Sequence, residues 1–414
     1  MNDQRFRETA CSAGNSGRML ASLVLAVCYL LTGNLPGQVT IRPSLPAWVE
    51  EVPVDLTPPE RPAEISGGYY TLLRDVQECH PQKTRYVHLA IQVMNTEGIQ
   101  IVSDLSRDFD PTFEELTWHF LRIHRNGKVE SLLDQHSIQT FRRETSMERF
   151  VYDGRLTAVI NLEDVRTGDI IEYGFSVKGQ NPYYSGHLLK HVYFDYPVPI
   201  KEIRYRLLLD PGSCYDLKYF NTKKLPRKNQ FQGWDELSWK VMNTPPILVD
   251  SNTPSWYQPF SSVMISDFPD WASVVDWAGQ YYVLSESDTR FLGQKAGQLF
   301  SGRTTRQRIL EALRFVQDEV RYLGFVDGIS AYAPTAPAQV LEQRFGDCKD
   351  KSLLLCGLLR SMGIDVYPVL VNTETTRSVL EHLPSPLAFD HVLVGQSSTS
   401  DKFNKLLQKG NNNE

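Results

Sequence analysis

GDCKDKSLLL, at positions 346–355, is the most informative stretch of this 414-residue chain. It leads into an apolar run and predicts that Cys348 lies in the first turn of a buried helix. The unpaired backbone N–H groups of a helix N-terminus carry roughly half a positive charge. Such a terminus stabilises a thiolate, and can lower the ordinary cysteine pKa of about 8.5 by one or more units. Two lysines add positive charge that two aspartates partly offset, so the stretch indicates a reactive thiol.

A candidate general base lies downstream at His391. Residues 353–362 have the pattern of a helix, and residues 365–372 that of a strand near a sheet edge, because Pro368 interrupts it. A cysteine on a helix followed by a histidine on a later strand is the order found in papain-like thiol enzymes. Cys348 and His391 are therefore the candidate nucleophile and base.

Two segments carry a family resemblance. RYLGFVDGISAYAPTAPAQVLEQRFGDCKDKSLLLCGLLRSMGIDVYPVLVNT, residues 321–373, and LPSPLAFDHVLV, residues 383–394, resemble the core of the transglutaminase-like superfamily in its exported bacterial form. The resemblance implies an α+β, papain-like fold with Cys348 as nucleophile and His391 as base. The family usually adds an aspartate on the strand after the histidine strand, which orients the imidazole. This chain departs from that pattern, and Asp401 is the carboxylate in reach for the third position.

The departure at the third position leaves two functions open. If the site is complete, the implied chemistry is cysteine-dependent acyl transfer on peptide or protein amides, as a peptidase, an amidase or a crosslinking enzyme. Its oxyanion hole would use the backbone N–H of Cys348 and a second donor that the sequence does not assign. The alternative is a catalytically impaired relative that serves as a binding or scaffolding module, with its core shortened at the C-terminus. Neither function calls for a cofactor, and the expected partner is a peptide or protein substrate.

Composition agrees with a modular protein that does not bind nucleic acid. The length suggests two domains with connections, and the net charge of −6 with scattered Lys and Arg indicates no nucleic-acid surface. Four of the six cysteines lie beyond the N-terminal segment and do not form a disulfide scaffold, although Cys79 and Cys214 could pair in an oxidising compartment. Cys356 lies two helical turns, or about 12 Å, beyond Cys348, so it is assigned to packing.

Residues 1–33 have the pattern of a secretory signal peptide or a membrane anchor. Three arginines precede an apolar run at residues 19–31. As a helix this run would be about 20 Å long, shorter than a hydrocarbon core of about 30 Å, which fits a signal peptide. We expect export to the periplasm or cell envelope, with an uncleaved anchor as the second choice and a buried helix as the third. This segment is the only expected contact with a membrane.

The next part of the chain changes from proline-rich to β-rich. Residues 34–66 are broken by prolines and predict an extended spacer. Residues 67–250 predict short strands, among them residues 116–121, whose alternation gives one strongly apolar face. Asn126-Gly127 predicts a hairpin turn, and the strand spacing favours a β-sandwich.

The β-rich region also has a family resemblance. It is similar to the domain of unknown function that commonly precedes the transglutaminase core in exported bacterial proteins, with DGR at residues 153–155 and TGDI at residues 167–170 in matching places. His187 and His191 have the spacing of a zinc pair, but the intervening residues lack a metalloprotease glutamate. We therefore expect no metal site.

The rest of the chain divides into a linker and junction at residues 251–285, the α+β core at residues 286–397 and a polar tail at residues 398–414. In the junction, Trp256, Tyr257 and Phe260 either pack between the domains or line a substrate groove. In the core, Thr304 and Gln307 match a capping box that opens an amphipathic helix.

Overall fold

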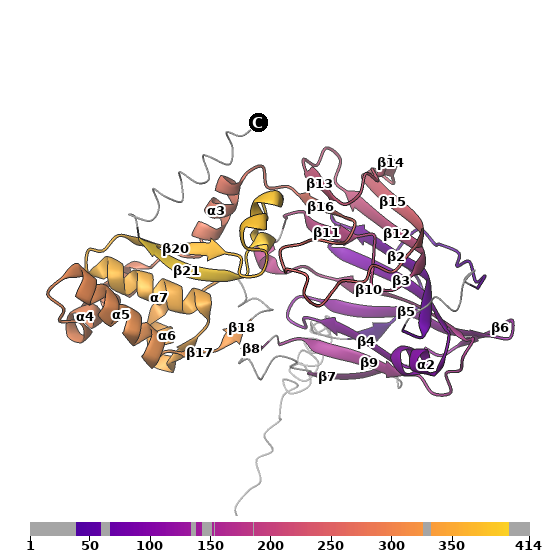
Figure 1. Ribbon diagram of the computed structural model, residues 1–414, viewed down its shortest axis with the longest axis horizontal. Helices are drawn as coiled ribbons and strands as arrows, with labels where there is room; N and C mark the ends of the chain where they lie inside the picture. Colours follow the sequence, from indigo (N-terminus) through magenta and orange to yellow (C-terminus); the bar gives the residue numbers. More distant parts are fainter. Residues whose placement is uncertain are drawn as a thin grey trace, which may run out of the picture.

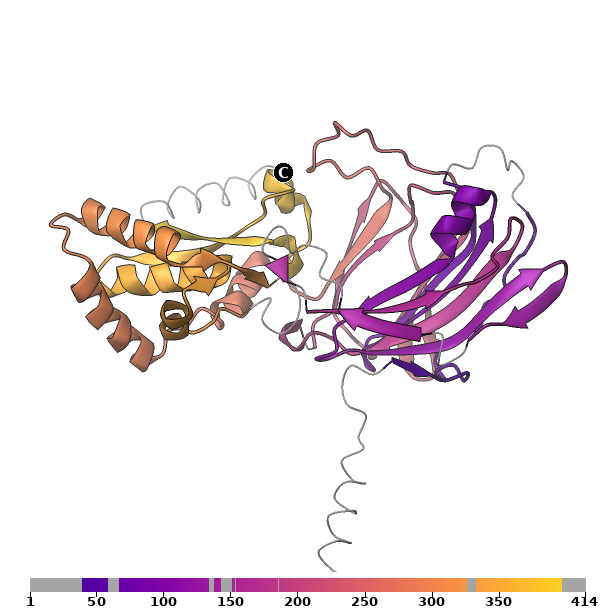
Figure 2. The ribbon, with the colours of Figure 1, turned by 90° about the horizontal axis from the view of Figure 1, so that it is seen from below.

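The computed structural model describes residues 39–58, 67–133, 138–142, 151–152, 154–184, 186–325 and 333–396. It is a β-rich protein of two bodies that lie side by side (Figures 1 and 2). We call residues 39–266 the β-rich domain and residues 271–396 the C-terminal domain. Among the described residues, no helix is both long and apolar enough to cross a bilayer. The predicted signal segment, the polar tail and Asp401 lie outside the described residues, so these predictions stay predictions.

The β-rich domain is built on a nine-stranded sheet in the order β1-β5-β10-β3-β2-β12-β15-β14, with β6 paired to β5. These strands are β1 Val39–Ile41, β2 Tyr69–Cys79, β3 Thr84–Val93, β5 Glu115–Arg125, β6 Lys128–Ser131, β10 Ile170–Lys178, β12 Ile200–Leu209, β14 Arg227–Phe231 and β15 Trp234–Thr244. The predicted hairpin turn joins β5 to β6, and both Asn126 (φ 51°) and Gly127 (φ 74°) adopt the positive φ that this turn needs.

Two three-stranded sheets pack on one face of the large sheet. One has the order β4-β9-β7 and the other β11-β16-β13. Their strands are β4 Asp104–Phe109, β7 Ile138–Arg142, β9 Leu156–Asn161, β11 Leu189–Tyr193, β13 Asp216–Phe220 and β16 Ser262–Ser266. Trp118 and Phe109 are central in the first interface, and Leu207 and Ile265 in the second. The helix α2 (Thr96–Val102) and the 3-10 helix η4 (Pro182–Tyr184) complete this domain.

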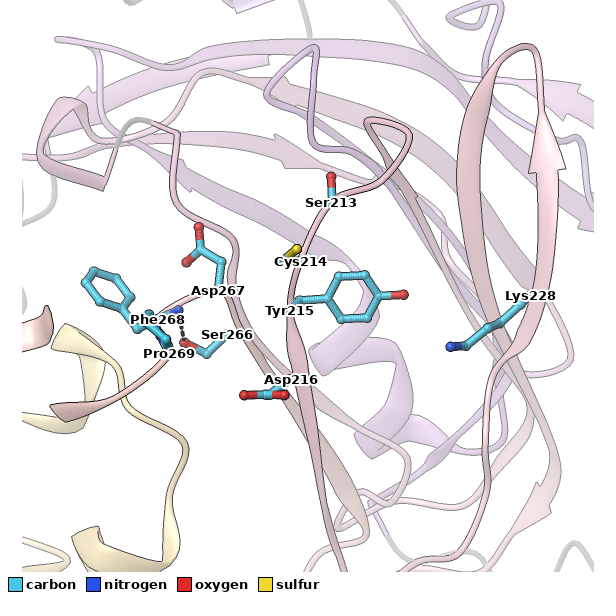
Figure 3. Close-up of a pocket in the computed structure, with 9 residues that line it drawn as sticks. All are labelled: Ser213, Cys214, Tyr215, Asp216, Lys228, Ser266, Asp267, Phe268 and Pro269. Carbon is cyan, nitrogen blue, oxygen red and sulfur yellow. Dashed lines mark hydrogen bonds between the residues drawn. The ribbon is translucent and has the colours of Figure 1, made fainter.

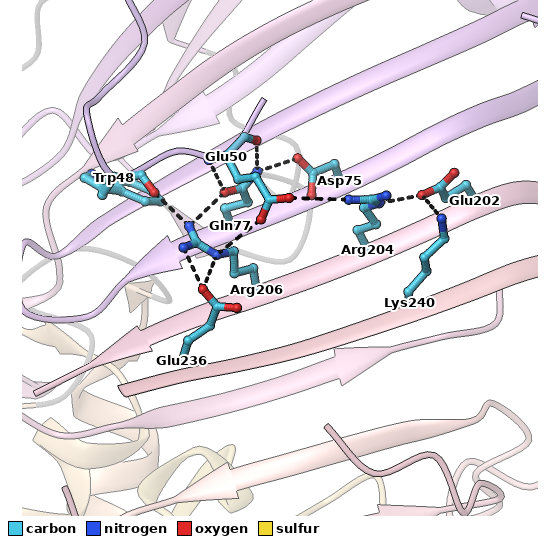
Figure 4. A network of polar contacts seen from close by, with 9 residues as sticks. All are labelled: Trp48, Glu50, Asp75, Gln77, Glu202, Arg204, Arg206, Glu236 and Lys240. Atoms are coloured by element: carbon cyan, nitrogen blue, oxygen red, sulfur yellow. Dashed lines mark hydrogen bonds and ion pairs between the residues drawn. The ribbon is translucent and has the colours of Figure 1, made fainter. Parts of the chain in front are cut away.

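Residues 39–58 lie across the other face of the large sheet, where the proline content had predicted a spacer. β1 pairs in parallel with β5, and Trp48, 2% exposed, packs with Cys79 and neighbouring apolar residues of the sheet. The Gln77 amide donates to the Glu50 carbonyl at 2.6 Å and accepts from the Glu50 N–H at 2.9 Å (Figure 4). Prolines exclude a helix here, but they do not prevent an extended segment from docking on a sheet.

The cysteines of this domain do not pair. Cys79 is buried beneath the docked segment, whereas Cys214 is exposed, and both are free thiols. Cys356, by contrast, lies in the core of the C-terminal domain with no exposed surface, which confirms its assignment to packing.

The C-terminal domain surrounds helix α7 (Cys348–Ser361), which packs against α4, α5, α6 and a two-stranded antiparallel sheet. Its other elements are α3 Trp271–Gly279, α4 Glu286–Leu299, α5 Thr305–Glu319, α6 Pro337–Gln343, β20 Val366–Val371, β21 His391–Gln396 and the short strands β17 Arg321–Tyr322, β18 Gly324–Phe325 and β19 Phe345–Gly346. The predicted capping box is present, with Thr304 and Gln307 exchanging side-chain and backbone hydrogen bonds at the start of α5.

The two domains are joined by hydrogen bonds at several places. β18 pairs in parallel with β8 (Val151–Tyr152) of the β-rich domain. Ser266 at the end of β16 donates its hydroxyl to the Pro384 carbonyl at 2.5 Å. The predicted junction at residues 251–285 therefore includes one strand of the β-rich domain and helix α3 of the other.

Two of the three aromatic side chains at the junction are not packed between the domains. Trp256 and Tyr257 are more than half exposed, at 52% and 55%, and Phe260 packs edge-on against Tyr193 within the β-rich domain. Their loop is tied to the C-terminal domain through the backbone, since the Ser378 hydroxyl donates to the Trp256 carbonyl at 3.4 Å.

Candidate active site

Cys348 is the first residue of α7, as predicted from the sequence. Asp347 is the N-cap, and its carboxylate accepts from the backbone N–H groups of Lys349 at 3.1 Å and Asp350 at 3.3 Å. Asp350 reciprocates by accepting from the Asp347 N–H at 3.1 Å, which completes a capping box. The two aspartates of the stretch therefore set where the helix begins and which residue occupies its first position.

Gly346 and Thr335 explain the rest of this local arrangement. A side chain at Gly346 would bring its Cβ within 2.7 Å of the Asp350 Cβ, so glycine is required if the capping box is to close. The Asp350 carboxylate also accepts from the Thr335 N–H at 2.6 Å, which ties the segment before α6 to the start of α7.

His391 begins strand β21, and the fold brings it to the same cavity as Cys348. In the two-stranded sheet His391 lies opposite Val371. The Ser352 hydroxyl, one turn into α7, donates to the Val392 carbonyl at 3.2 Å and so fixes the helix against the start of β21. Cys348 and His391 both line a cavity of about 350 Å³. A volume of this order is typical of small-molecule and peptide-side-chain sites, which hold about 300–1,000 Å³.

The surroundings of the Cys348 thiol raise its pKa, whereas the sequence predicted a lowered one. Burial raises the pKa of Cys348 above its ordinary value, and the charge of Asp347 raises it further. Lys349 and the backbone N–H groups of Val392 and Lys349 oppose this increase only in part. The prediction of a lowered pKa is wrong because it counted the positive helix terminus without the desolvation that the folded protein imposes on the sulfur.

The two lysines of the stretch have other partners. The Lys349 ammonium forms a buried ion pair with Asp347, so its main electrostatic interaction is with the capping carboxylate. Lys351 donates to the Val320 carbonyl at 2.6 Å, on the chain just before β17. Neither lysine therefore serves mainly to stabilise a thiolate.

Two tyrosines that sequence reasoning missed lie beside the sulfur. The Tyr322 hydroxyl forms a hydrogen bond with Cys348, and burial together with the neighbouring Cys348 and Asp347 raises the pKa of Tyr322 to about 12. Burial and Cys348 likewise raise the pKa of Tyr282. Tyr322 reaches this place because β17 pairs with β19, with Tyr322 opposite Gly346. The one available signal was its position in the RYLGF segment, and no spacing links that segment to Cys348.

The cavity has aromatic and aliphatic walls that come from both domains. They are formed by Tyr184 of the β-rich domain and by Trp277, Ala278, Tyr281, Leu370, Pro386, Leu387, Phe389 and Val392. Asp390 also lines the cavity, and its carboxylate accepts from the backbone N–H of Thr373 at 2.9 Å and from its hydroxyl at 3.0 Å.

Asp401, the carboxylate expected to orient His391, cannot be located relative to the cavity. Asp401 lies outside the described residues. Within the described ranges, no side chain forms a hydrogen bond with the His391 imidazole, and the neighbouring Asp390 is held by Thr373. Asp390 therefore does not substitute for the missing carboxylate.

The histidine pair considered for zinc has other partners. His187 Nδ1 lies 3.2 Å from the Asp267 carboxylate, and its ring stacks on Phe268. His191 Nε2 lies 3.0 Å from the Ser262 hydroxyl. In the part of the chain that the structure describes, no group of three His, Cys, Asp or Glu side chains is arranged to hold a metal.

A second cavity, of about 400 Å³, lies in the β-rich domain (Figure 3). It shares no lining residue with the first. The exposed Cys214 lines it together with Asp216, Asp267 and Lys228, but no imidazole does. Because no imidazole lies among the lining residues of this second cavity, the cavity at Cys348 is the better candidate for thiol chemistry of the cysteine–histidine kind.

Comparisons with known proteins agree with this architecture. A family model described as a domain of unknown function with a solved structure (DUF3857) matches residues 81–248, within the β-rich domain. A search of curated proteins found no match.

One solved structure extends the comparison beyond the β-rich domain. This structure, described as a "putative protease" from Parabacteroides distasonis ATCC 8503, aligns with a TM-score of 0.66 at 12% identity, over 80% of this chain and 65% of that chain. Another, described as a "putative nutrient binding protein" from Legionella pneumophila, aligns with a TM-score of 0.24 at 10% identity, over 72% of this chain and 95% of that chain. The first likeness shows a fold shared along most of this chain, and the family match is confined to the β-rich domain.

Proposed function

We propose that this chain is a transglutaminase-like cysteine enzyme that transfers acyl groups from peptide or protein amides. The observation that carries the proposal is the placement of Cys348 at the first position of α7 and of His391 at the start of β21, on the walls of one cavity. The resemblance of residues 321–373 and 383–394 to the transglutaminase-like core supports it. The shared fold with a protein described as a "putative protease" favours hydrolysis over amine transfer.

In the proposed reaction, the sulfur of Cys348 attacks the amide carbonyl carbon while His391 takes the thiol proton. The carbon–nitrogen bond then breaks, the nitrogen leaves with the proton that His391 returns, and a thioester remains on Cys348. Water or an amine attacks the thioester carbonyl carbon and gives its proton to His391. The carbon–sulfur bond then breaks, the acid or the new amide leaves, and His391 returns the proton to the sulfur. Because the pKa of Cys348 is raised, the attack depends on a base to take the thiol proton, and His391 has that role in this proposal.

The negative charge on the carbonyl oxygen needs donors. The backbone N–H of Cys348, at the first position of α7, has no partner within the helix and donates to the Tyr322 hydroxyl, so in this proposal the substrate oxygen replaces that hydroxyl as its acceptor. The Tyr322 hydroxyl, already hydrogen-bonded to Cys348, is the second donor in this proposal. It fills the position that the sequence left unassigned.

An acylation experiment tests the proposal. The full chain is treated with p-nitrophenyl acetate, and acetyl groups are mapped by peptide mass spectrometry while p-nitrophenol release is followed. We expect Cys348 to be acetylated faster than the exposed Cys214, and His391→Ala to slow acetylation of Cys348 by about 100-fold, the usual contribution of a general base. Cys214 serves as the internal control, because it is a free thiol outside the cavity.

Equal acetylation of Cys348 in the wild type and in His391→Ala would contradict acyl transfer. That result would favour the second candidate function, a binding or scaffolding module. The observation behind this alternative is the absence, among the described residues, of a side chain that orients the His391 imidazole.

We further propose that the chain acts in the periplasm or cell envelope. The support is the basic and apolar pattern of residues 1–33 together with the resemblance to exported proteins. Fractionation of bacteria that express the full chain, or the chain without residues 19–31, tests it. Recovery of both forms from the cytoplasm would contradict export.

A further inference from the structure

We propose that the β-rich domain supplies one wall of the substrate site, and that this wall selects an uncharged apolar side chain, preferably aromatic, next to the reacting amide. The proposal rests on the proposed function, because it names the substrate class of the same cavity. It gives the β-rich domain a direct part in recognition. The argument depends on which rings cross the domain boundary, how they are held and which charges face the cavity.

Aromatic rings from both domains meet in one wall of the cavity. The Tyr184 ring of η4 stacks on the Trp277 ring of α3, with centroids 5.6 Å apart and planes at 13°. The Tyr183 ring packs edge-on against Tyr281 at 4.9 Å. The Trp277 indole N–H donates to the Tyr183 carbonyl at 3.2 Å. Because Tyr184, Trp277 and Tyr281 line the cavity with Cys348, this cross-domain cluster is part of the site.

Hydrogen bonds within the β-rich domain hold η4 in place. The Tyr184 N–H donates to the Asn181 carbonyl at 3.0 Å, and the Gln180 amide donates to the carbonyls of Tyr184 at 3.1 Å and His187 at 3.2 Å. A wall fixed in this way is already shaped before a substrate arrives. Little ordering is then needed when a substrate side chain binds, which favours selectivity.

A second wall is also tied to the β-rich domain. Pro386 and Leu387 line the cavity, and the Pro384 carbonyl just before them accepts from the Ser266 hydroxyl of β16. The slot for a side chain is therefore lined by two groups of residues whose positions the β-rich domain helps to fix. This explains why the two domains are joined next to the cavity.

The charges that face the cavity disfavour an acidic side chain, and the aromatic and aliphatic residues of its walls favour an apolar one. Lys349 is paired with Asp347, so it is not available to a substrate carboxylate. Asp390 adds a negative charge held by Thr373, which disfavours an acidic substrate group. The remaining walls are aromatic or aliphatic, and about 350 Å³ accommodates one large side chain with its backbone.

Alkylation rates test the proposal without requiring turnover. The full chain is treated with iodoacetamide or with N-(2-phenylethyl)iodoacetamide, and modification of Cys348 and Cys214 is quantified by peptide mass spectrometry. We expect the phenylethyl reagent to be preferred at Cys348 by roughly 10- to 100-fold after normalisation to Cys214, the range of discrimination for an apolar pocket. Tyr184→Ala and Trp277→Ala should each remove most of this preference, whereas Tyr184→Phe should retain it.

Tyr193→Ala is the matched control, because Tyr193 is an aromatic residue of the same domain that packs on His191 away from the cavity. Melting temperatures of all variants identify any that fail to fold, and Tyr184→Leu then replaces Tyr184→Ala as the variant that keeps apolar volume but loses the stack. No preference in the wild type overturns the substrate class. A preference that survives both Tyr184→Ala and Tyr184→Leu overturns the role of the β-rich domain.

This result is separable from that of the acylation experiment. If Cys348 is not acetylated but prefers the phenylethyl reagent, the apolar slot exists and acyl transfer is contradicted. If Cys348 is acetylated with the help of His391 but shows no preference, acyl transfer stands and the slot is contradicted. Faster reaction with iodoacetate than with iodoacetamide, after the same normalisation, also overturns the slot, because it indicates an anion site.

Discussion

At the scale of single residues, burial raises the pKa of the Cys348 thiol, and the Asp347 carboxylate that starts its helix raises it further. Replacing Asp347 by Asn keeps a good helix cap but removes the negative charge beside the sulfur, and it frees Lys349 to face the thiolate. Both effects stabilise the charged form of Cys348.

The expected outcome of Asp347→Asn is a lower ionisation midpoint for Cys348. In the wild type the rate of alkylation by iodoacetamide should rise with pH through a midpoint above the ordinary cysteine pKa, because burial and Asp347 raise the pKa of Cys348. In the variant the midpoint should fall by about one pH unit, the lower end of the usual effect of a neighbouring charge. Asp365→Asn is the control, since Asp365 is exposed and does not line the cavity. An unchanged or higher midpoint in Asp347→Asn would show that Asp347 does not govern the thiol.

At the scale of elements, the start of α7 depends on a close approach between Gly346 and Asp350. In Gly346→Ala the new Cβ would lie 2.7 Å from the Asp350 Cβ, so the capping box must open or shift. We expect a loss of about 1–3 kcal/mol in the free energy of unfolding, from overpacking and the weakened cap. Slower acetylation of Cys348 should accompany it, because the first turn of α7 positions the sulfur.

Gly293→Ala should change the free energy of unfolding in the opposite direction. Gly293 lies inside α4, and a Cβ built there meets nothing within 4 Å. Alanine should therefore stabilise the helix by up to about 1 kcal/mol through its higher propensity. Denaturant unfolding of both variants measures the difference. If Gly346→Ala were as stable as Gly293→Ala, the steric account of the cap would be wrong.

At the scale of the whole molecule, the docked segment at residues 39–58 closes the far face of the large sheet. Trp48 and Val52 are 2% and 7% exposed, and the Arg206 guanidinium donates to the Trp48 carbonyl at 2.7 Å (Figure 4). Removing the segment would expose the apolar sheet residues beneath it and leave Arg206 with fewer partners.

A pair of truncations checks this account. A chain that begins at residue 39 should keep the stability of the β-rich domain, whereas one that begins at residue 59 should lose at least about 3 kcal/mol, the usual cost of removing one large buried side chain. Thermal unfolding followed by tryptophan fluorescence measures the difference. Equal melting temperatures of the two truncated chains would show that residues 39–58 act as a spacer and do not stabilise the sheet.

Local patterns were sufficient for several parts of this protein. The start of α7, the capping box of α5 and the turn after β5 each depend on residues within about four positions of one another, so GDCKD, Thr304 with Gln307, and Asn126-Gly127 predicted them correctly. The alternation of apolar residues likewise predicted strands such as β5. In each case the deciding hydrogen bonds or steric limits act along a short piece of chain.

Only the tertiary structure decided the pKa of the Cys348 thiol and which distant residues line the cavity. The pKa of Cys348 depends on how much water the fold removes, Tyr322 reaches the sulfur through the pairing of β17 with β19, and Tyr184 reaches the cavity from another domain. The docking of residues 39–58 on the large sheet depends on side chains far along the chain. Desolvation and contacts between distant residues arise only when the chain folds. Patterns of neighbouring residues in the sequence therefore do not predict them.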